Sequence, residues 1–321
     1  MTRPVFLLSL PRAGSTLLQR LLLMTGRCST LGEPSLLLRF LGEGPAMSRR
    51  ATYWESLVET STADIRKTWP EFDGAYRTGV RDLMQRIYDG LAEGKEFFID
   101  KTPRYSLIAG EILATFPEAK FIVLWRHPLA VAASISSTFR KGRWCPDEFG
   151  IDLHEGQRRL QEFCKQHGEA VFQLRYEDLV TEPGKELARL GSFLGIENLA
   201  DVLEHELVTS TGGTLGDPTG VKRYTKISPA GRDAWKKEIS NWYRRAWARA
   251  YVSGERAAAM KELGYGLPEE LARGGSAGLV EGLRDWIAAR WRIRRRLRQP
   301  TWLPRFAKRF RKEHGYEVSF R

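Results

Sequence analysis

The chain has 321 residues, of which 42% are hydrophobic and 28% are charged, a balance typical of a globular protein large enough to bury a core without disulfides. The formal net charge is +12, but residues 281–321 hold thirteen of the lysines and arginines and only four acidic residues. The remainder is close to neutral, so the charge alone does not indicate nucleic-acid binding, and we expect none.

The chain also lacks the sequence signals of a secreted or membrane-spanning protein. We find no signal-peptide pattern at the N-terminus, and no stretch approaches the roughly 20 apolar residues that would span a bilayer. The three cysteines have neither metal-ligand nor redox spacing, which favours a reducing compartment. We therefore expect a cytoplasmic protein.

Short apolar runs alternate with helical segments along the first 200 residues. The expected strands are 4–10, 97–100, 120–125 and 170–175, and the expected helices are 15–24, 106–116, 129–139 and 184–194. Nearly continuous apolar strands that alternate with helices predict an α/β fold, with a parallel sheet covered by helices on both faces in three layers.

The remaining segments carry no strand signal. Residues 42–94 are helical, aromatic and charged, which predicts a helical insert on the substrate side. Two further helices are expected within 228–263, and the Gly- and Ala-rich stretch 267–278 has the composition of a linker. We therefore expect one domain over 1–265, followed by a basic, aromatic extension over 266–321.

The segment LPRAGST, residues 10–16, lies between the first strand and the first helix. Backbone N–H groups and the dipole at a helix N-terminus attract anions, glycine lets the backbone approach closely, and the hydroxyls and the arginine add donors and charge. The alternative is a strand–turn–helix corner without a ligand. The residues expected at the anion are Arg12, Ala13, Gly14, Ser15 and Thr16.

This loop is not a Walker A motif. The first glycine and the lysine of that motif are missing, and the expected strands offer no clear magnesium-binding aspartate. We therefore expect no metal. A sulfuryl group carries one negative charge fewer than a phosphoryl group, so arginine and lysine can stabilise its transfer without magnesium.

Residues 5–23, VFLLSLPRAGSTLLQRLLL, resemble the 5′-phosphosulfate-binding loop of the sulfotransferase superfamily. Arg12 stands where many cytosolic members have lysine, and in this it is similar to the tyrosylprotein sulfotransferases and many bacterial members. The resemblance covers roughly 3–40, 96–140 and 170–265. It implies a P-loop-like sheet and 3′-phosphoadenosine 5′-phosphosulfate (PAPS) as the sulfuryl donor.

A second motif follows the strand 120–125. Arg126 stands at its carboxyl end, where ligands bind in open α/β sheets, and Ser134 follows on the next helix. This spacing resembles the 3′-phosphate-binding motif of the family, although a helix start with a surface arginine would look the same. Tyr176, in RYEDL, is similar to the tyrosine that approaches the adenosine in tyrosylprotein sulfotransferases.

The segment 216–226, which leads to Trp235, looks like the mobile loop whose lysine closes on the nucleotide in this family. Lys226 matches best by its distance to Trp235. Lys222 and Arg223 offer the same charge, and a solvated basic loop is the alternative.

The resemblance also implies catalytic groups. Glu33, 21 residues after Arg12, resembles the catalytic Gly-Glu of tyrosylprotein sulfotransferases, which implies a general base; the alternative is a carboxylate before a helix. Lys101 is similar to the transition-state lysine and would act with Arg12; the alternative is an ion pair with Asp100 or a surface turn. For His127 we expect a structural role.

The extension interleaves aromatic and basic residues. The aromatic residues within 282–312 are Trp286, Trp291, Trp302, Phe306 and Phe310. One interpretation is a helix packed by its Trp face with the arginines in water. Another is contact with an anionic membrane surface, which would make the protein peripheral to a membrane. A third is binding of an acidic acceptor.

The sequence as a whole thus predicts a PAPS-dependent sulfotransferase that acts on a hydroxyl or phenol of a small molecule, glycan or lipid. The rivals are a P-loop-type kinase and a non-catalytic membrane-surface adaptor on the same scaffold. The sequence specifies neither the acceptor nor the oligomeric state.

Overall fold

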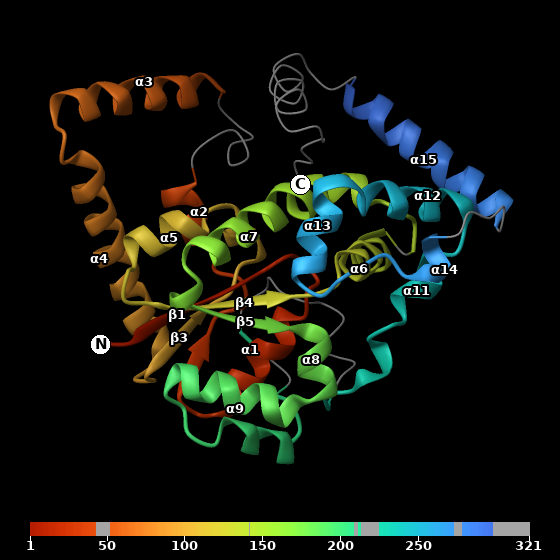
Figure 1. The fold of residues 1–321 in the computed structure, drawn as a ribbon. Coiled ribbons are helices and arrows are strands. Elements are labelled where there is room, and N and C mark those ends of the chain that lie inside the picture. The colour runs from red at the N-terminus through yellow and green to blue at the C-terminus, as the bar shows by residue number, and fades with distance from the viewer. Residues whose placement is uncertain (43–51, 141, 209–210, 213–224, 273–277, 298–321) are drawn as a thin grey trace.

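The computed structural model describes residues 1–42, 52–140, 142–208, 211–212, 225–272 and 278–297 (Figure 1). Over these residues the chain forms a five-stranded sheet in the order β2-β3-β1-β4-β5, with every neighbouring pair parallel. The strands are β1 Arg3–Ser9, β2 Cys28–Thr30, β3 Phe97–Asp100, β4 Lys120–Trp125 and β5 Val171–Arg175.

The pairing brings the carboxyl ends of neighbouring strands to one edge of the sheet. In the central strand β1, Val5 pairs with Ile99 of β3 and Leu7 pairs with Ile122 of β4. The loops after β1, β3 and β4 therefore leave the sheet side by side. This edge is where ligands bind in open parallel sheets.

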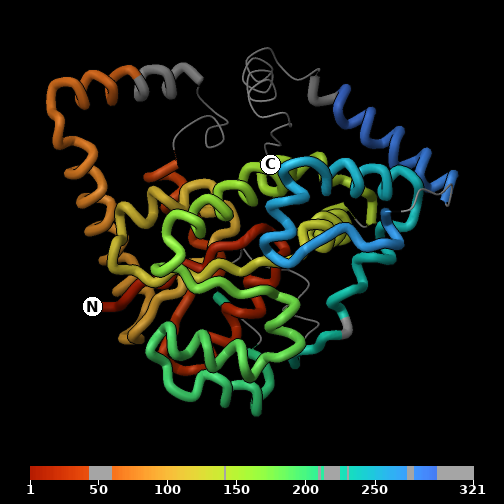
Figure 2. The backbone as a smooth tube through the Cα atoms, viewed as in Figure 1, coloured from red at the N-terminus to blue at the C-terminus, as the bar shows by residue number. Residues whose placement is uncertain are grey.

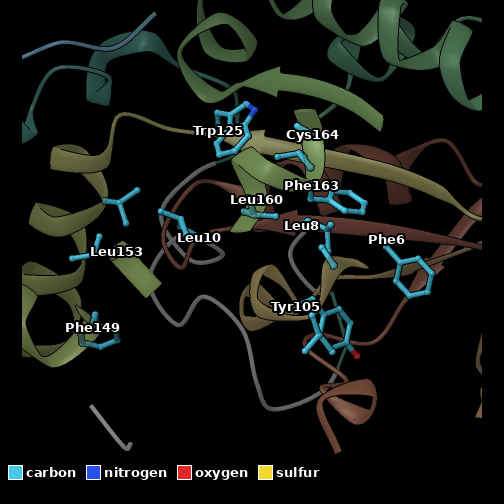
Figure 3. Close-up of a cluster of buried hydrophobic side chains, with 14 of the residues drawn as sticks. Phe6, Leu8, Leu10, Tyr105, Trp125, Phe149, Leu153, Leu160, Phe163 and Cys164 are labelled. Carbon is cyan, nitrogen blue, oxygen red and sulfur yellow. The ribbon is translucent and has the colours of Figure 1, made fainter. Parts of the chain in front are cut away.

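Helices cover both faces, as predicted. The face with Val5 and Leu7 carries α1 Ser15–Met24, α8 Tyr176–Thr181 and α9 Pro183–Leu194. The face with Phe6 and Leu8 carries α4 Phe72–Ala92, α5 Ala109–Thr115, α6 Pro128–Arg140 and α7 Gln157–Gln166. Figure 3 shows this second core, where Phe6 and Leu8 lie near Tyr105 and Phe163. Alternate residues of one strand thus fill two separate cores, because successive side chains point to opposite faces.

The remaining elements are short or peripheral. The α-helices are α2 Leu36–Leu41, α3 Thr52–Thr68, α11 Trp235–Glu238, α12 Trp242–Tyr251, α13 Gly254–Glu262, α14 Glu269–Ala272 and α15 Leu279–Leu297. The 3₁₀ turns are η1 Pro103–Leu107, η2 Pro146–Phe149, η4 Gly168–Ala170, η5 Leu199–Glu204 and η6 Pro229–Gly231, and η3 Ile151–Gly156 is a π-helix.

Two expected helical segments and the expected linker differ in detail from the prediction. The helix over 106–116 is split, because Ile108 leaves the helical region at φ −133° between η1 and α5. The region 228–263 forms α11, α12 and α13 rather than two helices, and the expected linker contains α14.

The insert contains no strand among its described residues, as predicted. The second half of α4 nevertheless belongs to the core of the sheet domain, since Val80, Met84 and Tyr88 are fully or almost fully buried there. The Tyr88 hydroxyl donates to Asp100 Oδ2 at 2.7 Å, at the end of β3. Helix α3 instead extends away from the sheet (Figure 2).

The C-terminal helix predicted from the basic segment is present as α15, and it packs along α12. In the part of the chain that the structure describes, no helix combines the length and the apolar character needed to cross a membrane.

Candidate active site

A cleft of about 840 Å³ opens at the carboxyl edge of the sheet. Its walls come from the loops after β1, β2, β3 and β4, from α8 and from the segment before α11. Most of the residues predicted for the site line it: Arg12, Gly14, Ser15, Thr16, Glu33, Arg126, Ser134, Tyr176 and Lys226. Ala13 and Lys101 are buried behind this lining.

The loop after β1 turns sharply into α1. Arg12 and Gly14 adopt left-handed backbone conformations, with φ of 66° and 98°, and the Ala13 N–H donates to the Leu10 carbonyl at 3.2 Å. No side chain caps α1, and the Leu17 N–H already donates to the Gly14 carbonyl, so the Ser15 and Thr16 N–H groups are the ones of its first turn that remain for an anion. A Cβ on Gly14 would lie 2.4 Å from Cδ2 of Tyr176, so the close packing of the Tyr176 ring requires glycine here.

Arg126 and Ser134 reach this loop from β4 and α6. Arg126 Nη1 donates to the Arg12 carbonyl at 2.8 Å, and Arg12 Nε donates to Ser134 Oγ at 3.3 Å. The Arg126 guanidinium also lies 4.4 Å from the centre of the Tyr176 ring. Burial lowers the pKa of Arg126, and its Nε has no hydrogen-bond partner. A buried cation with an unmet donor at a cleft suits a phosphate oxygen.

Glu33 and Lys101 meet at the same edge of the sheet. Lys101 Nζ donates to Glu33 Oε1 at 2.7 Å, with 1% of the lysine side chain and 26% of the glutamate side chain exposed. The neighbouring Gly32 is held on both sides, because its N–H donates to the Thr211 carbonyl and its carbonyl accepts from Gln19 of α1. Lys101 therefore orients Glu33 from within the protein.

The geometry does not favour the alternative in which Lys101 forms an ion pair with Asp100. Asp100 Oδ2 accepts hydrogen bonds from the Tyr88 hydroxyl at 2.7 Å and from the Tyr105 hydroxyl at 3.1 Å. Lys101 turns instead towards the cleft, where it meets Glu33.

A comparison with known protein families identifies the family of the chain. The model of the sulfotransferase family matches residues 4–201, which include β1 from its second residue, β2 to β5 and every predicted site residue except Lys226. The chain belongs to the sulfotransferase family.

Individual relatives are similar over different parts of the chain. Nodulation protein NoeE of Sinorhizobium fredii (strain NBRC 101917 / NGR234) is 31% identical over 216 residues, which are 60% of this chain and 50% of that protein. The chain therefore spans about half the length of this curated relative.

Two solved structures share the fold. The sulfotransferase domain from the curacin biosynthetic pathway matches with a TM-score of 0.57 and 23% identity, over 84% of this chain and 99% of that one. The sulfotransferase domain from the Synechococcus PCC 7002 olefin synthase matches with a TM-score of 0.55 and 25% identity, over 83% and 96%.

The predicted loop of this sulfotransferase is only partly described. Lys226 is exposed and lines the cleft, whereas Lys222 and Arg223 lie outside the described residues. The stem of the loop is closed by a hydrogen bond from the Leu207 N–H to the Thr225 carbonyl at 2.9 Å.

Arg20 of α1 holds the same stem and was missed at the level of sequence. Its Nη2 donates to the Leu207 carbonyl at 3.3 Å, and its Nε donates to the Val208 carbonyl. The side chain is 2% exposed although it is charged. The sequence did offer a signal for this role, since Arg20 is the single arginine within the apolar run of α1.

The sequence also gave no indication of the wall beside Glu33. Arg104 Nε donates to Asp152 Oδ1 at 3.4 Å, and the Asp152 side chain is fully buried in the π-helix η3. Burial raises the pKa of Asp152, and its Oδ2 has no hydrogen-bond partner. Phe139 and Phe149 stack nearby along the cleft, with ring centres 5.2 Å apart. This end of the cleft thus combines an ion pair with an apolar surface.

His127 has the structural role that the sequence suggested. Its Nδ1 accepts from the Leu129 N–H at 3.2 Å, which leaves Nε2 to donate to the Gly266 carbonyl at 2.9 Å. Burial lowers its pKa. With both ring nitrogens engaged, His127 is not available as a base.

Within the described ranges, no three His, Cys, Asp or Glu side chains come together in a way that would hold a metal ion.

Proposed function

We propose that this protein transfers a sulfuryl group from PAPS to a hydroxyl or phenol oxygen. The observation that carries the proposal is the Glu33–Lys101 pair, whose glutamate lines the same cleft as the loop after β1 and Arg126. Membership of the sulfotransferase family supports the reaction class.

The donor fits the basic end of the cleft. The first turn of α1 and Arg12 would bind the 5′-phosphosulfate, because uncapped N–H groups and a guanidinium converge there. Arg126 would bind the 3′-phosphate through its guanidinium, together with Ser134, since both residues line the cleft. Tyr176 would contact the adenosine, and Lys226 would close over the phosphates.

The positions of the charged side chains in the cleft suggest the role of each in the reaction. Glu33 takes the proton of the acceptor hydroxyl as the acceptor oxygen bonds to sulfur. The bond between sulfur and the bridging phosphate oxygen breaks, and its electron pair stays on that oxygen as 3′,5′-adenosine bisphosphate (PAP) leaves. Arg12 and Lys101 stabilise the negative charge that develops there. Lys101 also holds the carboxylate at 2.7 Å, so its orientation is set before the acceptor arrives.

The other end of the cleft suits an acceptor with both apolar and polar parts. Phe139 and Phe149 offer an apolar surface, and Arg104 offers donors beside the buried Asp152. Small molecules, glycans and lipids that carry a hydroxyl belong to this class.

The three cysteines are free and buried, which supports a cytoplasmic location.

Nucleotide binding tests the proposal against a P-loop-type kinase. PAP carries phosphates at the 3′ and 5′ positions, whereas AMP carries only the second. Calorimetric titration should show at least tenfold tighter binding of PAP, unchanged by EDTA. Equal affinity for the two nucleotides, or turnover of ATP that depends on magnesium, would favour the kinase instead.

A further inference from the structure

Helix α15 lies on the body with its polar side inward and its apolar side outward. The outward side chains are between 36% and 77% exposed, and they are Leu279, Val280, Leu283, Trp286, Ile287 and Trp291. Their spacing places them on one side of the helix. Figures 1 and 2 show α15 at the periphery of the molecule, beside α12.

Polar contacts fix the helix in this orientation. Asp285 is buried, where it accepts from Asn241 Nδ2 at 2.8 Å and from Arg244 Nε at 2.6 Å. About two turns further on, Arg292 Nη2 donates to Asp147 Oδ1 at 2.8 Å. Rotating the apolar side inward would break these contacts and leave buried charges unpaired, which is costly.

Close packing at Gly282 fixes the same orientation. A Cβ on this residue would lie 2.2 Å from Nε1 of Trp242, so only glycine fits against α12. The interpretation of a helix packed by its Trp face is therefore wrong for Trp286 and Trp291. Trp302, Phe306 and Phe310 lie outside the described residues.

The outward side of α15 also carries positive charge. Arg284, Arg290 and Arg294 are exposed on it, and the Arg290 guanidinium lies 4.7 Å from the centre of the Trp286 ring. Tryptophan and leucine beside arginine is the composition of helices that lie in the headgroup region of a membrane, where the rings enter the lipid and the guanidinium groups meet phosphates.

We propose that this face of α15, defined by the six apolar side chains above and Arg284, Arg290 and Arg294, binds the surface of an anionic membrane. The segment from Leu279 to Trp291 is about 18 Å long and about 10 Å wide, a footprint on the order of 200 Å². A stable protein interface needs about 800 Å² per partner. A second copy would also place arginine opposite arginine, whereas anionic lipid complements them.

The proposal is independent of the sulfuryl-transfer reaction, because none of its residues lines the candidate active site. It does predict where the enzyme works. The polar contacts of Asp285 and Arg292 would transmit the attachment to the body, so the cleft would be held at a fixed orientation to the lipid surface.

Vesicle flotation of the full chain tests the proposal. Wild-type protein should float with phosphatidylcholine vesicles that contain phosphatidylglycerol, and at least tenfold less with vesicles of phosphatidylcholine alone. The double variant Leu283→Glu/Ile287→Glu should lose at least tenfold in partitioning to the anionic vesicles. Both side chains are at least half exposed, so the variant should fold, which its thermal midpoint and PAP affinity would verify.

The matched control is Leu203→Glu, an exposed leucine on η5, which should float like wild type. Arg284→Gln/Arg290→Gln should weaken flotation, and added salt should weaken it further. Wild type that does not float, or equal flotation of the double variant, overturns the proposal. Sedimentation velocity tests whether a second copy of the chain covers this face instead. If wild type is a dimer and Leu283→Glu/Ile287→Glu is a monomer, the face belongs to a second copy.

Discussion

Lys101 donates a hydrogen bond to Glu33 across 2.7 Å, and the lysine is almost wholly buried while the glutamate opens onto the cleft. The two residues lie at the carboxyl ends of adjacent strands, β3 and β2, so the sheet itself brings them together. A base at an active site has to be oriented, and Lys101 orients Glu33; in the proposed reaction Lys101 would also stabilise the negative charge that develops on the leaving group.

Glu33→Gln should abolish turnover and leave PAP affinity unchanged. The amide keeps a carbonyl that accepts from Lys101, but it no longer accepts a proton, and general-base catalysis is worth about 10²–10⁴-fold. Single-turnover kinetics with PAPS, beside PAP titration, measure the two effects. Glu111→Gln, which changes an exposed carboxylate on α5, is the control. A near-normal rate would assign the base role to another group.

Arg126→Ala should weaken PAP binding about tenfold to hundredfold, because a charge-assisted hydrogen bond contributes about 1.5–3 kcal/mol. AMP, which lacks the 3′-phosphate, should lose much less. Arg140→Ala is the control, since that arginine ends α6, the helix that follows Arg126, and pairs with Glu148 at 2.8 Å. If Arg126→Ala weakens both nucleotides equally, the 3′-phosphate assignment fails.

Gly14→Ala should reduce PAP affinity by at least tenfold. The new Cβ would lie 2.4 Å from the Tyr176 ring, which must shift out of the adenosine position, and alanine at φ 98° is strained by about 1–2 kcal/mol. Gly26→Ala separates the two causes, because that glycine also has positive φ but open space around it. Calorimetry should therefore find PAP binding intact in Gly26→Ala. Equal losses of PAP affinity in the two variants would indicate that backbone strain, rather than the contact with Tyr176, causes the loss.

Asp100 makes the stability of the fold depend on pH. Burial raises its pKa to about 6, above the ordinary value of 3.8, so the folded chain holds this proton more tightly than the unfolded chain does. Its contribution to the free energy of unfolding is therefore greatest below pH 4 and falls as pH rises through 6, by up to about 3 kcal/mol.

Urea unfolding of wild type and Asp100→Asn at pH 4 and pH 7 measures this effect. The asparagine can still accept from the Tyr88 hydroxyl, but it does not titrate. Wild type should lose stability relative to the variant as pH rises. A difference between the two proteins that stays constant over this range would show that Asp100 does not titrate there.

The sequence predicted the features that depend on local patterns. The loop 10–16 stood out because its arginine, glycine and hydroxyl residues separate an apolar strand from an apolar helix, and Arg126 stood out because it ends a strand. The three-residue strand β2 was missed, since so short a run has no period to recognise.

Other features depend on contacts between distant segments. The Arg104–Asp152 pair joins residues 48 positions apart through a π-helix, and no spacing in the sequence indicates it. The orientation of α15 follows from Asp285 and Arg292, whose partners Arg244 and Asp147 lie on α12 and in η2. The amphipathic pattern alone would have turned the apolar side inward.

The central claim is that one cleft binds PAPS and passes its sulfuryl group to an acceptor with Glu33 as the base. The most direct measurement is transfer of the label from PAPS that carries radioactive sulfur to a panel of alcohols, phenols and glycosides without added metal, with the release of unlabelled PAP followed beside it. The account predicts that wild type releases PAP and labels an acceptor, whereas Glu33→Gln binds PAP equally well and labels none. Labelling by Glu33→Gln at the wild-type rate, or no transfer by wild type to any acceptor of the panel, would contradict it.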